Sequence, residues 1–251
     1  MSMVHRGAAA LSLALLLAAC GGGETVPAPA GTSTNSTTAV HSVNLPECGG
    51  PPRPASPDGA FPSCRLTSND SAALSFVVRF EAAGRTATET IEVVDRSGAV
   101  RATLMERDVV VQFPPQLIDL DGDGRDELVV PRDSAANGNT RYVVYRDSDS
   151  GFVRAGELSG EPPQRTPSGY IAVAAKRGAA SWDIGFWTID GRLLREHTRV
   201  QIESHLDDRG TGTSVCRLTD AQGRPDQALT ESEAGQRFCA EPIVVSHKPY
   251  N

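Results

Sequence analysis

The feature that most constrains this fold is a long succession of short branched and aromatic runs separated by turn residues. They lie at 74–80, 89–94, 99–104, 109–113, 116–120, 127–130, 141–146, 152–158, 170–175, 182–189 and 193–202. Turn signals such as Asp190-Gly191 separate the runs, a pattern that predicts strands joined by hairpins. Helical periodicity is nearly absent, and only residues 229–237 favour a short helix. The sequence therefore predicts an all-β antiparallel meander of about ten short strands, arranged as an irregular propeller, a barrel or a sandwich.

The beginning of the chain carries an export signal. His5 and Arg6 precede an apolar run that ends in Leu-Ala-Ala-Cys at Cys20, which is typical of a secretory signal and too short for a membrane span. A cysteine after Leu-Ala-Ala resembles the lipobox of bacterial lipoproteins. The resemblance implies cleavage before Cys20 and attachment of diacylglycerol to its sulfur, so that the lipid bilayer is one partner; an ordinary signal peptide is the alternative. Gly21 follows where Asp would mark inner-membrane retention, which favours an outer-membrane protein facing the periplasm.

Three segments follow from composition. Residues 1–19 are the predicted lipoprotein signal peptide, residues 20–47 the predicted lipidated cysteine with a flexible linker, and residues 48–251 an all-β domain, which its aspartate-rich loop marks as calcium-binding. Gly, Pro, Ser, Thr and Ala dominate the linker, a composition that cannot bury enough apolar surface to order itself. Without residues 1–19 the chain keeps 23 basic and 31 acidic residues, a net charge of −8. This acidity argues against nucleic acid as a partner.

Four cysteines remain besides the predicted anchor, and an even number in an exported chain favours two disulfides. They are Cys48, Cys64, Cys216 and Cys239. Three pairings are possible, of which the local one joins Cys48 to Cys64 and Cys216 to Cys239. Metal binding is the weaker alternative, because no Cys-x-x-Cys and no ligand-spaced histidine accompanies them.

An aspartate-rich loop gives the clearest local chemistry. Counting from Asp119, its candidate calcium ligands are Asp119, Asp121, Asp123, the backbone carbonyl of Arg125, and Glu127, with a glycine at the sixth position. Ca²⁺ prefers six to eight oxygen ligands, and this spacing wraps carboxylates around one point. Strand-like runs flank the loop, so it belongs to a β-hairpin and not to an EF-hand. It resembles the calcium loops of FG-GAP and VCBS repeats, with Glu127 in place of the last Asp. An acidic turn without metal is the alternative.

No signature of catalysis accompanies this loop. The chain has no Gly-x-Ser-x-Gly motif, and no pair of histidines stands at metal-ligand spacing. We therefore expect a protein that is not an enzyme, although a hydrolase with two distant acidic residues stays a third possibility.

A second resemblance comes from the order of motifs between about residues 74 and 202. The aspartate loop is followed by Gly-Asn-Thr-Arg-Tyr at residues 138–142, an aromatic strand and a Gly-Phe turn. This order resembles bacterial envelope lipoproteins that act as immunity proteins against lysozyme-like peptidoglycan hydrolases of killing type IV secretion systems. The resemblance implies a calcium-stabilised inhibitor, with Asn139, Arg141 and Tyr142 as contact residues. The alternative is a structural or adhesive calcium-binding surface lipoprotein of the FG-GAP/VCBS kind.

Overall fold

The computed structural model describes residues 45–49, 63–83, 86–109, 113–149, 151–220 and 229–250. All of them belong to one compact unit, Val40–Asn251. The predicted signal peptide, the predicted lipidation site Cys20 and most of the predicted linker lie outside the described residues. Within the described ranges, no helix is both long and apolar enough to cross a membrane.

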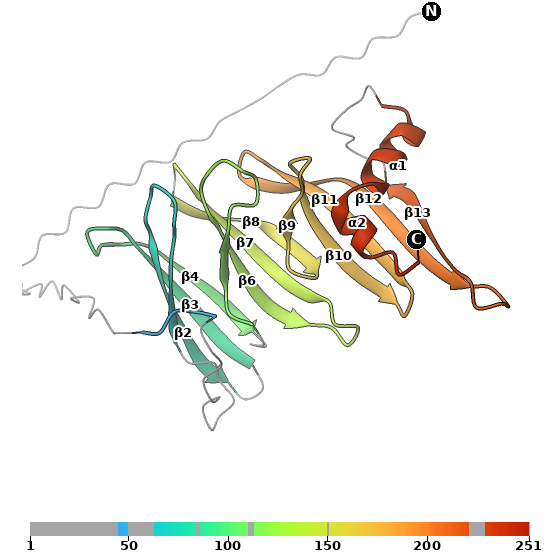
Figure 1. The fold of residues 1–251 in the computed structure, drawn as a ribbon. Coiled ribbons are helices and arrows are strands. Elements are labelled where there is room, and N and C mark those ends of the chain that lie inside the picture. The colour runs from blue at the N-terminus through green and yellow to red at the C-terminus, as the bar shows by residue number, and fades with distance from the viewer. Residues whose placement is uncertain are drawn as a thin grey trace, which may run out of the picture. The chain divides into compact units, whose positions relative to one another are not determined.

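Thirteen strands in the described residues form three antiparallel sheets, each following chain order (Figure 1). The first sheet contains β1 (Cys64–Thr67), β2 (Ser75–Ala83), β3 (Thr86–Val94) and β4 (Val100–Val109). The middle sheet contains β5 (Gln116–Ile118), β6 (Glu127–Ser134), β7 (Thr140–Ser148) and β8 (Gly151–Gly160). The third contains β9 (Gln164–Arg165), β10 (Ile171–Gly178), β11 (Ser181–Asp190), β12 (Leu193–Leu206) and β13 (Gly212–Asp220). The predicted all-β meander is confirmed, and the barrel alternative is wrong because none of these sheets closes on itself.

The middle sheet is buried on both faces because it lies between the other two. Leu128 and Val130 of β6 pack into the core shared with the first sheet, whereas Val129 packs with Ile171 of the third. Successive side chains of a strand point to opposite faces, so a strand covered on both sides shows continuous burial. The first five residues of β6 are accordingly all buried. Glu127 is the charged member of this run, and its burial requires an explanation.

Two C-terminal helices, α1 (Glu231–Cys239) and α2 (Pro242–Ser246), pack against the third sheet. A capping box starts α1, in which the Thr230 hydroxyl accepts from the Glu233 N–H and the Glu233 carboxylate accepts from the Thr230 N–H. Phe238 places its ring 4.8 Å from that of Phe186. The helices therefore cover an apolar sheet face that would otherwise meet water.

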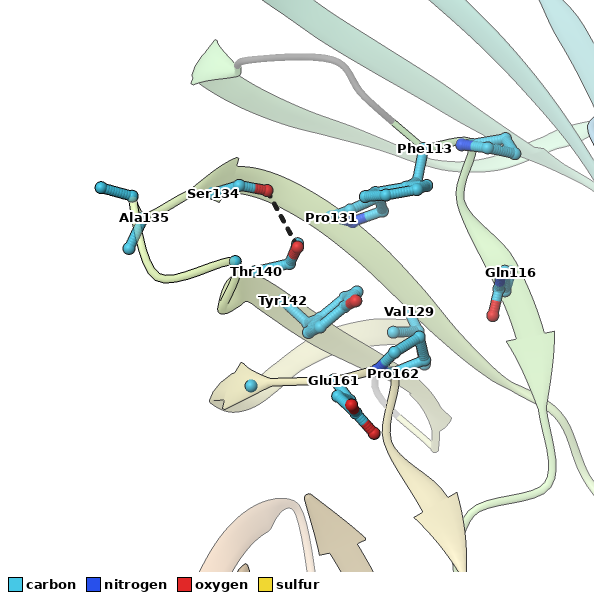
Figure 2. Close-up of a pocket in the computed structure, with 14 residues that line it drawn as sticks. Phe113, Gln116, Val129, Pro131, Ser134, Ala135, Thr140, Tyr142, Glu161 and Pro162 are labelled. Carbon is cyan, nitrogen blue, oxygen red and sulfur yellow. Dashed lines mark hydrogen bonds between the residues drawn. The ribbon is translucent and has the colours of Figure 1, made fainter. Parts of the chain in front are cut away.

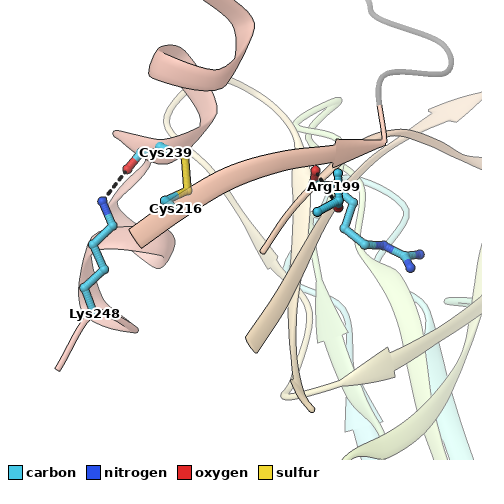
Figure 3. The surroundings of a disulfide bond; sticks show 5 residues. Arg199, Cys216, Cys239 and Lys248 are labelled. Atoms are coloured by element: carbon cyan, nitrogen blue, oxygen red, sulfur yellow. Dashed lines mark hydrogen bonds between the residues drawn. A yellow bond between two sulfur atoms is a disulfide. The ribbon is translucent and has the colours of Figure 1, made fainter. Parts of the chain in front are cut away.

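Two disulfides join the cysteines in the local pairing. Cys48 bonds to Cys64 and Cys216 to Cys239, with Cα–Cα distances of 5.0 and 5.9 Å. The second bond fastens the end of α1 to the edge strand β13 (Figure 3), and the Lys248 ammonium donates to the Cys239 carbonyl beside it. Closing a loop of this length stabilises a fold by about 3 kcal/mol in the chain-entropy description.

The observed elements differ from the prediction at β4 and in several short or edge elements. The runs at 99–104 and 109–113 were predicted as separate strands, but β4 is continuous through Val109 and Phe113 lies outside any strand. The intervening charged residues do not end β4, because Glu106 points inward opposite Glu89 of β3. The strands β1, β9 and β13 and the helix α2 were not predicted, whereas the helix predicted at 229–237 forms at Glu231–Cys239.

Candidate calcium site

Asp119, Asp121 and Asp123 lie in the loop between β5 and β6 and shape it through bonds to its backbone. The Asp119 carboxylate accepts from the N–H groups of Gly122 (2.7 Å) and Gly124 (3.2 Å). Asp121 accepts from the N–H of Asp123 at 3.1 Å. Gly122 and Gly124 have φ of +78° and +82°, a region that glycine enters without steric cost. The two glycines thus allow the sharp turns that gather the carboxylates.

Three of the five predicted ligands converge. Asp119, Asp121 and Glu127 each offer a carboxylate oxygen, and these oxygens all lie within 4.8 Å of one another. Glu127 begins β6 and is only 1% exposed. One of its carboxylate oxygens accepts from the Leu120 N–H at 2.9 Å. Burial raises the pKa of Glu127 to about 8, since the buried carboxylate loses its hydration, although this hydrogen bond opposes the shift.

The remaining two predicted ligands point their side chains elsewhere. The Asp123 carboxylate lies 3.2 Å from the guanidinium of Arg146 on β7. The Arg125 guanidinium lies 2.6 Å from the carboxylate of Asp147, also on β7. The prediction for Arg125 concerned its backbone carbonyl, which these side-chain contacts do not test.

The converging residues fit a calcium ion. All three supply carboxylate oxygens, the ligand type that a hard cation prefers. A buried glutamate beside two aspartates is costly when all three are ionised, and a divalent cation between them would remove that cost. In this setting Ca²⁺ would supply charge neutralisation and a rigid centre, and Asp119, Asp121 and Glu127 would hold it.

Arg146 is the residue of this site that the sequence analysis missed. It extends from β7, with its side chain 14% exposed, and its Nη1 and Nη2 lie 3.2 Å from carboxylate oxygens of Asp121 and Asp123, respectively. Nη1 also donates to the carbonyl of Gly191 in the turn between β11 and β12, at 3.2 Å. The strand at 141–146 was predicted, but nothing in the sequence indicates which neighbour its last residue meets.

The aspartate loop is also tied to the first sheet. The Asp126 N–H donates to the Asp70 carboxylate at 3.0 Å, and the Asn69 N–H donates to the Asp126 carboxylate at 3.3 Å. Asp70 belongs to the segment between β1 and β2. The loop therefore bonds directly to the segment between β1 and β2 and to Arg146 of the middle sheet, and Arg146 in turn bonds to Gly191 of the third sheet.

The predicted partner contacts do not form one surface. Asn139 bonds the backbone of Lys176 on β10, donating to its carbonyl (3.0 Å) and accepting from its N–H (2.8 Å). Arg141 is exposed and pairs with Asp133. Tyr142 is only 5% exposed and packs in the core between the middle and third sheets. Arg141 and Tyr142 are consecutive strand residues and so point to opposite faces.

Tyr142 reaches a pocket of about 530 Å³ at one end of the middle sheet. Figure 2 shows its ring beside Pro131 and Phe113, and a hydrogen bond of 2.9 Å joins the Ser134 and Thr140 hydroxyls near it. The Phe113 residue is 51% exposed. Such a cavity has the size of a site for a small ligand or a partner side chain.

The fold and site define an all-β protein of three stacked sheets with a carboxylate-rich loop in the middle one. The sequence matches no protein-family model and no curated protein. Among solved structures, the chain is similar to one described as "Structure of a Xanthomonas Type IV Secretion System related protein", with 12% identity and a TM-score of 0.42. That likeness covers 68% of this chain and 94% of the other. Identity and TM-score at this level carry no argument about function.

Proposed function

We propose that this chain is a lipid-anchored, calcium-stabilised binding protein of the bacterial envelope that inhibits a lysozyme-like peptidoglycan hydrolase. The observation that carries the proposal is the convergence of Asp119, Asp121 and Glu127 in the β5–β6 hairpin. This loop, together with the lipobox and the order of motifs that follows it, is what the sequence resemblance to calcium-binding immunity lipoproteins rests on. The role of the ion is structural, since it would sit in a loop that bonds to the segment between β1 and β2 and to Arg146 of β7.

The structure offers a partner an accessible pocket next to Tyr142. Its apolar lining and the exposed Phe113 at its edge favour an inserted side chain over a polar ligand. The net charge of −8 after removal of residues 1–19 suits a basic lysozyme-like enzyme, and such complementarity raises the association rate more than the affinity. The exposed Arg141 provides a contact on the opposite face of β7.

The test is inhibition of cell-wall lysis. The purified full-length chain, in detergent and millimolar CaCl₂, should suppress lysis by a lysozyme-like muramidase at a near-equimolar ratio. The hydrolase encoded beside this chain is the enzyme of choice, and a general lysozyme is the second. Calcium-dependent stability without inhibition of either enzyme would reject the immunity role and favour the structural or adhesive alternative.

Mutations at Tyr142 need care in this test. Because Tyr142 is buried, Tyr142→Ala would cost about 3–5 kcal/mol of folding stability and confound loss of binding with unfolding. Tyr142→Phe keeps the ring and removes only the hydroxyl, so it reports on binding. Loss of inhibition by a folded Tyr142→Phe chain would place the hydroxyl in the interface.

The lipid anchor is tested separately. Cells that express the chain with labelled palmitate should incorporate label into the wild-type protein, and Cys20→Ser should remove it. The lipid should leave hydrolase affinity in detergent unchanged, because it only places the domain at the membrane. Absence of label in the wild type would reject the anchor while leaving the inhibitory role open to its own assay.

A further inference from the structure

A buried arginine occupies the aspartate loop as an internal counter-ion. Arg146 lies with one guanidinium nitrogen 3.2 Å from Asp121 and another 3.2 Å from Asp123. It also acts electrostatically on Glu127, where its positive charge favours the ionised form. The Arg146 guanidinium thus faces two carboxylates: that of Asp121, which belongs to the converging cluster, and that of Asp123, which does not.

We propose that Arg146 sets the calcium affinity of the loop by competing with the ion for Asp121. The proposal rests on the calcium site of the proposed function. Without calcium, the guanidinium neutralises Asp121 and Asp123 and limits their mutual repulsion. With calcium, Asp121 turns its oxygens to the ion, and the guanidinium either leaves Asp121 or stays beside a divalent cation that repels it.

The size of this effect follows from Coulomb's law. A unit charge about 6 Å from a divalent cation, largely screened by water, weakens binding roughly tenfold. The side chain of Arg146 is mostly buried, so less water screens it than screens a surface arginine. Its length and its bond to the Gly191 carbonyl keep it at the loop.

The contact with Gly191 gives the competition a structural consequence. Gly191 lies in the β11–β12 turn of the third sheet, whereas the aspartate loop belongs to the middle sheet. Arg146 therefore bridges these sheets when it holds Asp121 and Asp123. A calcium ion that takes Asp121 leaves Arg146 only the Asp123 and Gly191 partners.

The experiment compares metal-stripped wild-type and Arg146→Met full-length chains by titration calorimetry with CaCl₂. We expect Arg146→Met to bind calcium about tenfold more tightly. In EDTA it should melt at a lower temperature than the wild type, because two aspartates lose their cation; saturating calcium should narrow that gap. A gain in calcium affinity, paired with a lower melting temperature in EDTA and a larger stabilisation by calcium, is a signature that a merely structural arginine would not give.

Arg132→Met is the matched control. Arg132 lies on β6, its side chain is 19% exposed, and it pairs with Glu106 and Glu157 away from the loop. Its substitution should leave calcium affinity unchanged. If Arg146→Met does not fold, Arg146→Gln replaces it, since a neutral amide can still donate to the Gly191 carbonyl.

The outcomes separate the two proposals. If the wild type binds calcium at least as tightly as the Arg146 variants, the proposed role of Arg146 is wrong, although the calcium site is supported. No binding by the wild type or by the Arg146 variants overturns both. If only the Arg146 variants bind calcium, the result supports Arg146 as a competitor strong enough to keep the wild-type loop free of metal.

Discussion

Two glutamates, Glu127 and Glu89, are equally buried but differ in the groups that surround their carboxylates. Each is 1% exposed, and burial raises the pKa of each to about 8. Glu127 receives a backbone hydrogen bond and lies among carboxylates that converge on one point. Glu89 faces Glu106 across β3 and β4, and its Oε1 has no hydrogen-bond partner among the described residues.

The comparison shows that a raised carboxyl pKa occurs in two different kinds of surroundings in one molecule. Around Glu106, the Tyr145 hydroxyl donates to the carboxylate and the Arg132 guanidinium lies 3.3 Å from it. Among the described residues, no comparable contact supports an ionised Glu89, which we expect to carry a proton at neutral pH. Glu127 instead lies where a cation could neutralise it. We expect a proton to neutralise Glu89, whereas the proposed calcium ion would neutralise Glu127.

The largest expected effect is the pH dependence that Glu89 gives to stability. Its folded pKa, about 8, is above the ordinary value of 4.5, so its stabilising contribution is complete below pH 4.5 and is lost as pH rises through 8. Between those limits the free energy of unfolding should fall by on the order of 2–4 kcal/mol. Glu89→Gln should remove most of this decline when urea unfolding is measured at several pH values in saturating calcium.

The groups around Glu89 define the control for this measurement. Its cross-strand neighbour is Glu106, which Tyr145, Arg132 and Arg154 approach. Glu92→Gln alters the same strand at a partly exposed carboxylate that pairs with Arg79, and it should leave the pH profile of stability nearly intact. Equal profiles for wild type and Glu89→Gln would show that Glu89 is ionised in the folded state.

The second-largest expected effect is stabilisation of the folded chain by calcium. At a calcium concentration a hundred times the dissociation constant, the folded chain should gain about 2.7 kcal/mol over the metal-free chain. Asp121→Asn keeps the shape of the side chain but removes a ligand charge, and should abolish most of this gain. The measurement is thermal melting of metal-stripped protein in EDTA and in millimolar CaCl₂.

Asp133→Asn serves as the control for that substitution, since Asp133 lies outside the loop and pairs with Arg141. It should retain the full calcium response. Identical melting of the wild type in EDTA and CaCl₂ would reject the calcium site and remove the distinction between the two glutamates.

The sequence predicted the middle of this molecule better than its ends. The β6 and β7 strands were evident because both of their faces are buried, which makes their apolar runs continuous. The aspartate loop was evident because its ligand spacing is local and its glycines are obligatory. The edge strand β13 was missed because its described side chains alternate between exposed and half-buried, which leaves only a weak apolar pattern.

What the sequence could not supply were contacts between distant segments. Arg146 lies about twenty residues after Asp123 in the chain, and no local pattern relates them. Glu106 lies between the predicted strands 99–104 and 109–113, and it meets Tyr145 and Arg132, which come from another sheet. Tyr142 was predicted as a partner contact, but whether a tyrosine next to a turn is buried depends on how the sheets stack.

The smallest effect tests whether the Glu89 site only supports the fold. At saturating calcium and neutral pH, Glu89→Gln should leave hydrolase affinity unchanged, because Glu89 is sealed inside the molecule. Phe113→Ser, at the accessible edge of the pocket, should weaken binding by about 1 kcal/mol, roughly fivefold in Kd. Arg141→Glu examines the opposite face of β7. Surface plasmon resonance with the immobilised hydrolase measures all three, and melting of each variant checks its fold. A loss of hydrolase affinity confined to Arg141→Glu would place the interface on the Arg141 side of β7. A loss of affinity in Glu89→Gln would mean that the buried Glu89 shapes the binding surface.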